Sequence, residues 1–144
     1  MNVEVDFDKV GDFLKQHKDI LFALVFGSAA KKEMNKLSDV DIGIYTADEM
    51  PLLEIGKIVV GLEKIVKKKV DLVVLNDLFK RKPNFAFQLV SSSRLLFTGD
   101  EDALVDFKRN VFLYYLDAKP LIDMMKASLD RRLKAGRFGE RNYA

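Results

Sequence analysis

Apolar and polar positions along the chain form blocks that predict helices and strands in alternation. Apolar side chains within residues 7–18 recur at helical spacing and predict a first helix. Residues 20–26 form a continuous apolar run that ends at Gly27, which is typical of a strand buried on both faces. Two further apolar runs, at 40–45 and 70–75, predict a second and a third strand.

Helices are expected between and after these strands. Residues 51–66 begin with Pro, which is favoured in a first helical turn, and continue with apolar positions at helical spacing. Residues 83–92 predict a short helix, and 94–97 predict a further strand. Turn and capping residues at 98–100 precede a long helical tail. Pro120 is expected to kink or divide that tail.

The order of these elements predicts an α/β (α+β) fold with a mixed sheet of about four strands flanked by helices. A long helical segment follows from about residue 100. A short helix is expected at 28–32, a loop at 34–37, and frayed residues at 136–144. The sequence contains no internal repeat, low-complexity tract or linker, so residues 1–144 are expected to form a single domain.

The composition narrows the possible chemistry. The 144 residues include no Cys and a single His, His17, while 49% are hydrophobic, which is enough for a packed core. These counts exclude a disulfide framework, a thiolate zinc site, a cysteine nucleophile and a cluster of imidazole ligands. Any chemistry therefore depends on carboxylates, hydroxyls and backbone groups.

The chain shows no targeting or membrane signal. Its acidic start lacks the basic and apolar stretches of a secretory signal. No apolar run approaches the ~18–20 residues that a membrane span requires. We therefore expect a cytoplasmic protein that does not associate with membranes.

The net charge of +2 hides a segregation of charge. Residues 1–56 carry 6 basic and 11 acidic side chains, whereas residues 57–99 carry 9 and 3. Two interpretations fit this pattern: the walls of a site for a metal-bound polyanion, or the solvated faces of unrelated helices. The basic residues of the tail are not accompanied by a recognisable nucleic-acid module, so direct nucleic-acid binding is not expected.

The chemically informative stretch joins a Gly-Ser pair to an Asp-x-Asp pair ten residues later. Gly27 allows a sharp turn and a close approach to a ligand. Ser28 offers a hydroxyl and, at a helix start, a free backbone N–H, and both suit phosphate oxygens. Asp39 and Asp41 are two residues apart in a strand, so their carboxylates point to the same face. Such carboxylates repel each other unless cations intervene, and Mg²⁺ prefers oxygen ligands of this kind.

A third carboxylate, Asp71, lies at the start of the next apolar strand. If that strand is adjacent in the sheet, Asp71 reaches the same cations from the side. Three acids at the end of a sheet beside a Gly-Ser turn suit two-metal phosphoryl transfer, with ions about 3.5–4 Å apart. One ion activates an attacking hydroxyl, and both hold the reacting phosphate. The sequence therefore predicts Asp39, Asp41 and Asp71 as catalytic and metal-binding residues.

The motif Gly27-Ser28-x10-Asp39-x-Asp41 resembles the signature of the DNA polymerase β-like nucleotidyltransferase superfamily. The compact length is similar to that of its minimal nucleotidyltransferase (MNT) branch, the MntA-type antitoxins of HEPN/MNT toxin–antitoxin pairs. The resemblance covers roughly residues 8–125 and extends through the stretches 38–42, 70–76, 94–97 and 114–120. The motif is specific to the superfamily, whereas the tail only suggests the branch.

The resemblance implies a nucleotidyltransferase fold that binds ATP with Mg²⁺, with two ions expected, and transfers AMP. Gly27 and Ser28 match the nucleotide-binding positions that hold the triphosphate. Asp39 and Asp41 match the metal ligands, and Asp71 matches the third acid. In MntA-like proteins the acceptor is a tyrosine hydroxyl near the ribonuclease motif of a HEPN-type toxin, which is the expected partner in a hetero-oligomer. AMP groups there add charge and bulk that block RNA binding or cleavage.

The sequence departs from the family pattern at one place. Many relatives carry Arg directly after the Gly-Ser pair and again two residues later, where this chain has Ala29 and Lys31. A Lys is a point charge for phosphate and lacks the bidentate fork of Arg. Two alternatives stay open: an antitoxin that neutralises its toxin by binding alone, and a nucleotidyltransferase acting on a small molecule such as an aminoglycoside.

Overall fold

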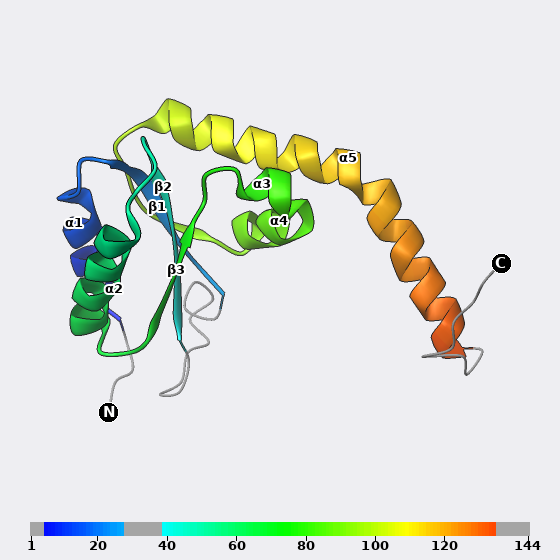
Figure 1. The fold of residues 1–144 in the computed structure, drawn as a ribbon, viewed down its shortest axis with the longest axis horizontal. Coiled ribbons are helices and arrows are strands. Elements are labelled where there is room, and N and C mark those ends of the chain that lie inside the picture. Colours follow the sequence, from blue (N-terminus) through cyan, green and yellow to red (C-terminus); the bar gives the residue numbers. More distant parts are fainter. Residues whose placement is uncertain (1–4, 28–38, 135–144) are drawn as a thin grey trace.

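A computed structural model describes residues 5–27 and 39–134 of the chain (Figure 1). Along the sequence, the elements are α1 (Phe7–Lys15), β1 (Ile20–Phe26), β2 (Val40–Thr46), α2 (Leu52–Val66), β3 (Val70–Val74), α3 (Leu78–Arg81), α4 (Pro83–Ser91), β4 (Arg94–Thr98) and α5 (Glu101–Lys134). The four strands form a sheet in the order β3-β2-β1-β4. Because β2 and β3 run parallel while β1 is antiparallel to β2 and β4, the sheet is mixed, as predicted.

Helices cover both faces of this sheet (Figure 1). α1 and α2 pack on one face, where their buried side chains join the core residues of β2. α3, α4 and the first half of α5 pack on the other face, around Phe22 and Phe107. β1 supplies side chains to both cores, with Ala23 and Val25 on the first face and Leu24 and Phe26 on the second. The prediction of a strand buried on both faces is therefore confirmed.

Two short backbone hydrogen bonds extend the parallel ladder of β2 and β3. The N–H of Val40 donates to the carbonyl of Lys69 at 2.9 Å at the start, and the N–H of Leu75 donates to the carbonyl of Ile44 at 2.8 Å at the end. Gly43 lies between them and makes room for the buried Leu75, because a Cβ at Gly43 would lie 2.8 Å from Leu75 Cδ2. Close packing across the two strands thus supports their register.

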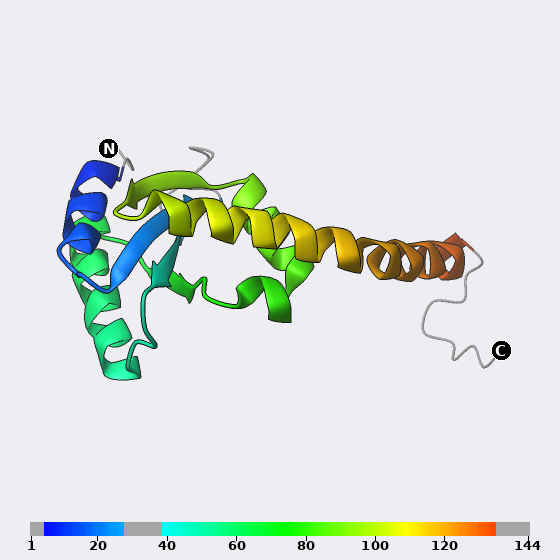
Figure 2. The same ribbon diagram turned by 90° about the horizontal axis from the view of Figure 1, so that it is seen from above.

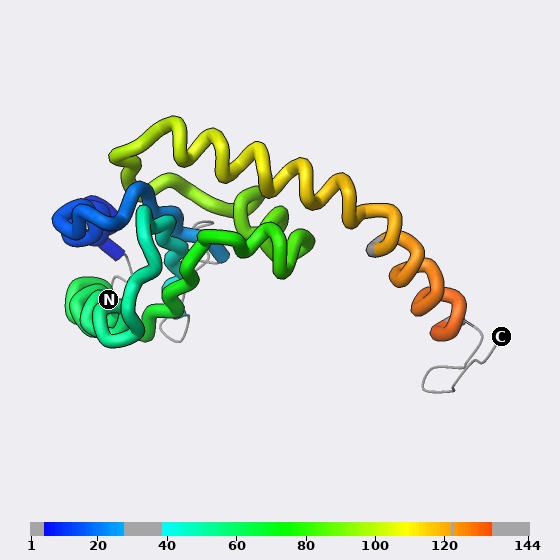
Figure 3. The backbone as a smooth tube through the Cα atoms, turned by 45° about the horizontal axis from the view of Figure 1, so that its top comes forward, coloured from blue at the N-terminus to red at the C-terminus, as the bar shows by residue number. Residues whose placement is uncertain are grey.

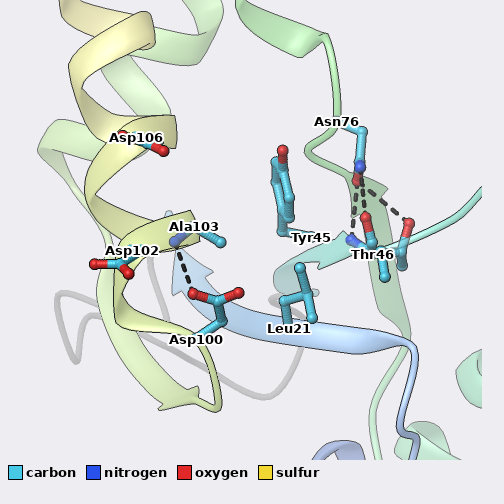
Figure 4. Close-up of a pocket in the computed structure, with 9 residues that line it drawn as sticks. Leu21, Tyr45, Thr46, Asn76, Asp100, Asp102, Ala103 and Asp106 are labelled. Atoms are coloured by element: carbon cyan, nitrogen blue, oxygen red, sulfur yellow. Dashed lines mark hydrogen bonds between the residues drawn. The ribbon is translucent and has the colours of Figure 1, made fainter.

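A side-chain clamp closes the same ladder at its far end (Figure 4). The Asn76 Nδ2 donates to the Thr46 carbonyl at 2.7 Å, and the Thr46 N–H donates back to Asn76 Oδ1 at 3.0 Å. The Thr46 hydroxyl also donates to Asn76 Oδ1, at 3.3 Å. Thr46 is only 2% exposed, so its polar groups depend on Asn76 for their hydrogen bonds.

α5 is 34 residues long, and only its first half packs on the body of the protein (Figures 2 and 3). Leu104, Phe107 and Val111 are buried in the second core. Of the kink or division expected at Pro120, division is wrong, because the helix continues through this residue. Instead, the second half of the helix bends where it extends beyond the body (Figure 1).

Several predicted helices and strands begin or end at other residues in the structure. The first helix ends at Lys15 instead of residue 18, and β2 and β4 each extend one residue further than expected. The short helix α3 was not predicted, because its four residues show no helical periodicity. The helix expected at 28–32, the loop at 34–37 and the fraying at 136–144 lie outside the described residues.

Within the described ranges, no helix combines the length and the apolar character that crossing a bilayer requires. Even α5, the longest, carries charged side chains along its whole length.

The Asn76 clamp generates a prediction about stability. Asn76→Ala removes both partners that Thr46 uses and leaves buried polar groups unsatisfied, so we expect the free energy of unfolding to fall by about 1–3 kcal/mol. Urea denaturation measures this loss. The matched control is Asn110→Ala, within α5, which leaves the clamp intact. Equal stabilities of the two variants would contradict a structural role for Asn76.

Candidate functional site

The residues predicted to carry chemistry gather at one end of the sheet, where β1 ends and β2 and β3 begin. Gly27 directly follows β1, Asp39 directly precedes β2, and Asp41 and Asp71 are the second residues of β2 and β3. β2 and β3 are neighbours, and their register makes Asp41 and Asp71 direct partners. The adjacency on which a joint role for Asp71 depends is therefore present in the sheet.

The two carboxylates lie on the sheet face that α3 and α4 cover. Asp41 is also the register partner of Phe26 on β1, and Phe26 belongs to the core beneath these helices. Side chains of directly paired residues point to the same face of a sheet. Asp41 and Asp71 therefore share that face, and Asp39, two residues before Asp41, is placed on the same side.

Gly27 brings the backbone against the Asp41 carboxylate. Its φ of 70° lies in the left-handed region that glycine adopts without strain. A Cβ built at this position would lie 2.5 Å from Asp41 Oδ2, closer than real Cβ contacts allow. Both facts favour glycine here, since a side chain would strain the turn and displace the carboxylate. The sharp turn predicted at Gly27 is confirmed.

The electrostatics of the site are unfavourable to the ionised form of Asp41. Burial raises the pKa of the Asp41 carboxyl above its usual 3.8, and the negative charges of Asp71 and Asp39 raise it further. Asp41 is half-buried, whereas Asp39 and Asp71 are exposed. The three carboxylates thus interact through their charges, and the central one is the least stable as an anion.

The donor set suits a hard divalent cation, although it is not drawn together into a finished cluster. Carboxylate oxygens are the ligands that Mg²⁺ prefers, and a cation would relieve the repulsion that raises the pKa of Asp41. Within residues 5–27 and 39–134, no group of three acidic or His side chains converges as formed metal sites do. The chemistry of the residues fits such an ion.

An aromatic pair borders this end of the sheet. Phe85 of α4 meets Phe26 edge-on, with ring centroids 6.5 Å apart, and is 40% exposed. The role of Asn76 in fixing the strands was not predicted, although a polar residue directly after an apolar strand was a usable signal. Ser28, Ala29 and Lys31, named in the sequence prediction, lie outside the described residues.

A separate cleft of about 460 Å³ lies at the opposite end of the sheet (Figure 4). It is lined by Leu21, Tyr45, Thr46 and Asn76 and by acidic residues at the start of α5. One of these, Asp100, accepts a hydrogen bond from the backbone N–H of Ala103 at 3.0 Å and so caps the helix. Gly27, Asp39, Asp41 and Asp71 do not line this cleft, so its size is no guide to their chemistry.

Comparisons with known proteins bear on the family and the fold of the chain. The family model described as polymerase beta, nucleotidyltransferase, matches residues 8–102, more than half of the chain. This range contains Gly27 and all three carboxylates. No curated protein matches the chain.

Several solved structures share the fold. One, described as a toxin–antitoxin with AMP-PNP, has a TM-score of 0.61 and 17% identity over 91% of this chain and 98% of its own. A mutant of the toxin–antitoxin MntA-HpeT has a TM-score of 0.70 and 18% identity, covering 85% and 99%. A tri-AMPylated Shewanella oneidensis HEPN toxin in complex with MNT antitoxin has a TM-score of 0.62 and 19% identity, covering 83% and 95%. At these identities, the likeness shows the fold.

The raised pKa of Asp41 predicts a pH-dependent stability. Between the usual pKa and the raised one, the folded chain binds more protons than the unfolded chain, so the free energy of unfolding falls as pH rises through this window. The Asp41→Asn variant has no carboxyl to ionise at this position, so it does not lose this stability as the pH rises. In metal-free buffer, we expect Asp41→Asn to melt at a higher temperature than the wild type at pH 7, with the gain vanishing below pH ~3.8.

Thermal melts recorded from pH 3 to pH 7 measure this difference. Asp12→Asn, on the exposed face of α1, controls for the loss of one carboxylate elsewhere. A variant at position 41 that melts below the wild type at pH 7 would show that the carboxylate stabilises the fold and would refute the assignment.

Proposed function

The chain belongs to the polymerase β nucleotidyltransferase family, and on that premise we propose that it transfers AMP from ATP to a tyrosine hydroxyl of a HEPN-type ribonuclease toxin. The observation that carries the proposal is the placement of Asp41 and Asp71 as register partners beside the Gly27 turn. Similar solved structures include one with AMP-PNP and one with a tri-AMPylated toxin, which supports both the nucleotide and the acceptor.

In this proposal, Asp39, Asp41 and Asp71 hold Mg²⁺, with two ions expected. When bound, Mg²⁺ neutralises phosphate charge and helps to activate the attacking hydroxyl. The turn at Gly27 leaves its backbone open to the triphosphate, because no Cβ projects there. Ser28 is proposed to add a hydroxyl and a backbone N–H to the same phosphates.

The reaction exchanges one phosphorus–oxygen bond for another. The tyrosine oxygen attacks the α-phosphorus of ATP, a new P–O bond forms, and the bond between the α-phosphorus and the bridging oxygen breaks. Pyrophosphate leaves with the electron pair of that bond. The hydroxyl proton passes to a carboxylate of the site, and Asp71 is suited to accept it because it is exposed on the edge strand β3.

The exposure of the site favours a macromolecular acceptor. Asp39 and Asp71 are open to solvent, and β3 is an edge strand, so a tyrosine on a protein surface has access from the side. The protein acceptor is therefore the proposal that we adopt.

The activity has a direct test. With labelled ATP, Mg²⁺ and the HEPN-type toxin that the proposal expects as partner, we expect label on the toxin and release of pyrophosphate. The double substitution Asp39→Asn and Asp41→Asn should lower the rate by about 10³-fold or more, because the phosphate charge is no longer neutralised. Chelation of Mg²⁺ should have the same effect on the wild type. The matched control, Asp8→Asn with Asp12→Asn on α1, should leave the rate unchanged.

The same variants separate catalysis from binding. If the double variant at 39 and 41 binds the toxin normally but no longer protects cells from it, neutralisation depends on transfer. Full protection by that variant would instead establish an antitoxin that acts by masking alone. Transfer of label to a small molecule and not to the toxin would assign the enzyme to the remaining alternative.

A further inference from the structure

The part of α5 beyond the body is an amphipathic helix whose apolar side is uncovered in the single chain. This distal segment, residues 117–131, extends away from the sheet and its other helices (Figure 2). Leu121, Met124 and Met125 are 62–68% exposed. A helix of this length is marginal in water by itself, so a partner that covers its apolar side would stabilise it.

The polar and apolar sides of the distal segment are separate except at Leu129, which is 46% exposed and lies one turn after Lys126. Lys119 and Asp123 form an ion pair of 2.6 Å on one side, which Lys126 continues. Leu121 and Met125, four residues apart, define the opposite side. The same side carries two small residues, Ala118 and Ser128, one turn beyond each end of this pair. The resulting stripe follows the spacing of a helix-pairing seam, with large side chains in the middle and small ones at its ends.

Two opposite charges border this stripe on one edge. Asp117 and Arg131 are both exposed, and they are fourteen residues apart, which is two heptads. Met124 lies midway between them. All three therefore lie along the same edge of the apolar stripe. Among the described residues, the structure records no ion pair for Asp117 or Arg131.

We propose that the distal segment pairs antiparallel with the same segment of a second copy of this chain. Antiparallel pairing about Met124 places Asp117 beside Arg131 of the second copy, and the reverse contact follows by twofold symmetry. In the same register, Leu121 packs on Met125 of the second copy, and Ala118 lies opposite Ser128 of the second copy. One arrangement thus satisfies the apolar stripe and both bordering charges.

The charge pattern selects this occupant and orientation. In a parallel pair, Asp117 and Arg131 would lie roughly 21 Å apart along the helix axis, fourteen residues at about 1.5 Å each, so neither charge would meet its opposite. In the antiparallel pair, the acidic end of this edge faces the basic end of the same edge on the second copy.

A pair of helices of about fifteen residues buries less than the roughly 1,600 Å² of a standard interface, so we expect a dimer with a dissociation constant of roughly 10 μM. The pairing uses none of the residues of the candidate site.

Sedimentation velocity of the full chain over a range of concentrations tests the pairing. Asp117→Arg and Arg131→Asp should each weaken dimerisation by about tenfold or more, because each places like charges together. The double variant, Asp117→Arg with Arg131→Asp, should return to within about threefold of the wild type, because the pair is restored with its sign reversed. Lys126→Asp, on the polar side, is the matched control and should dimerise normally.

Circular dichroism of each variant confirms that α5 keeps its helical content. A wild type that remains monomeric at about 500 μM, far above the expected dissociation constant, overturns the proposal. So does a double variant that is as weak as either single variant. A chain that is monomeric alone, and whose Met125→Lys variant loses the toxin partner, would assign the apolar side to that partner and likewise refute self-pairing.

Discussion

The parallel register of β2 and β3 is the constraint on which the candidate site depends. It places Asp41 directly beside Asp71 even though both are anions. The carboxylates gain nothing from this arrangement, because burial and neighbouring charge raise the pKa of Asp41. The register is maintained by groups away from the carboxylates: ladder hydrogen bonds at Val40 and Leu75, and the clamp between Asn76 and Thr46. The register of β2 and β3 thus keeps the two carboxylates adjacent although their negative charges repel each other.

This conflict has a simple physical interpretation. Groups that destabilise a fold persist where function requires them, and repelling carboxylates at the end of a sheet are a natural cation site. Gly27 contributes to the same arrangement, since its missing side chain leaves room for the Asp41 carboxylate and the turn. The family assignment and the proposed AMP transfer give this arrangement a chemical purpose.

The sequence predicted the parts of this structure that local patterns determine. The apolar run of β1 predicted burial on both faces, and the Asp-x-Asp spacing placed two carboxylates on one side. Whether Asp71 joined them depended on strand order, which no local pattern contains. The position of Asn76 opposite Thr46, 30 residues away in sequence, could not be predicted for the same reason. Pro120 was misjudged in part because a helix tolerates one proline, with a bend, when most of its other hydrogen bonds remain.

The central claim, that the end of the sheet bearing Gly27 and the three carboxylates binds a divalent cation, has a direct spectroscopic test. Mn²⁺ substitutes for Mg²⁺ at oxygen sites and broadens the NMR signals of nearby amides. Titrated into the ¹⁵N-labelled protein, it should first broaden the amides of Gly27, Asp41 and Asp71 and leave Asn76 sharp. If broadening began instead at Asn76 and the acidic start of α5, the cation would bind the opposite end of the sheet, and the role assigned to the three carboxylates would be wrong.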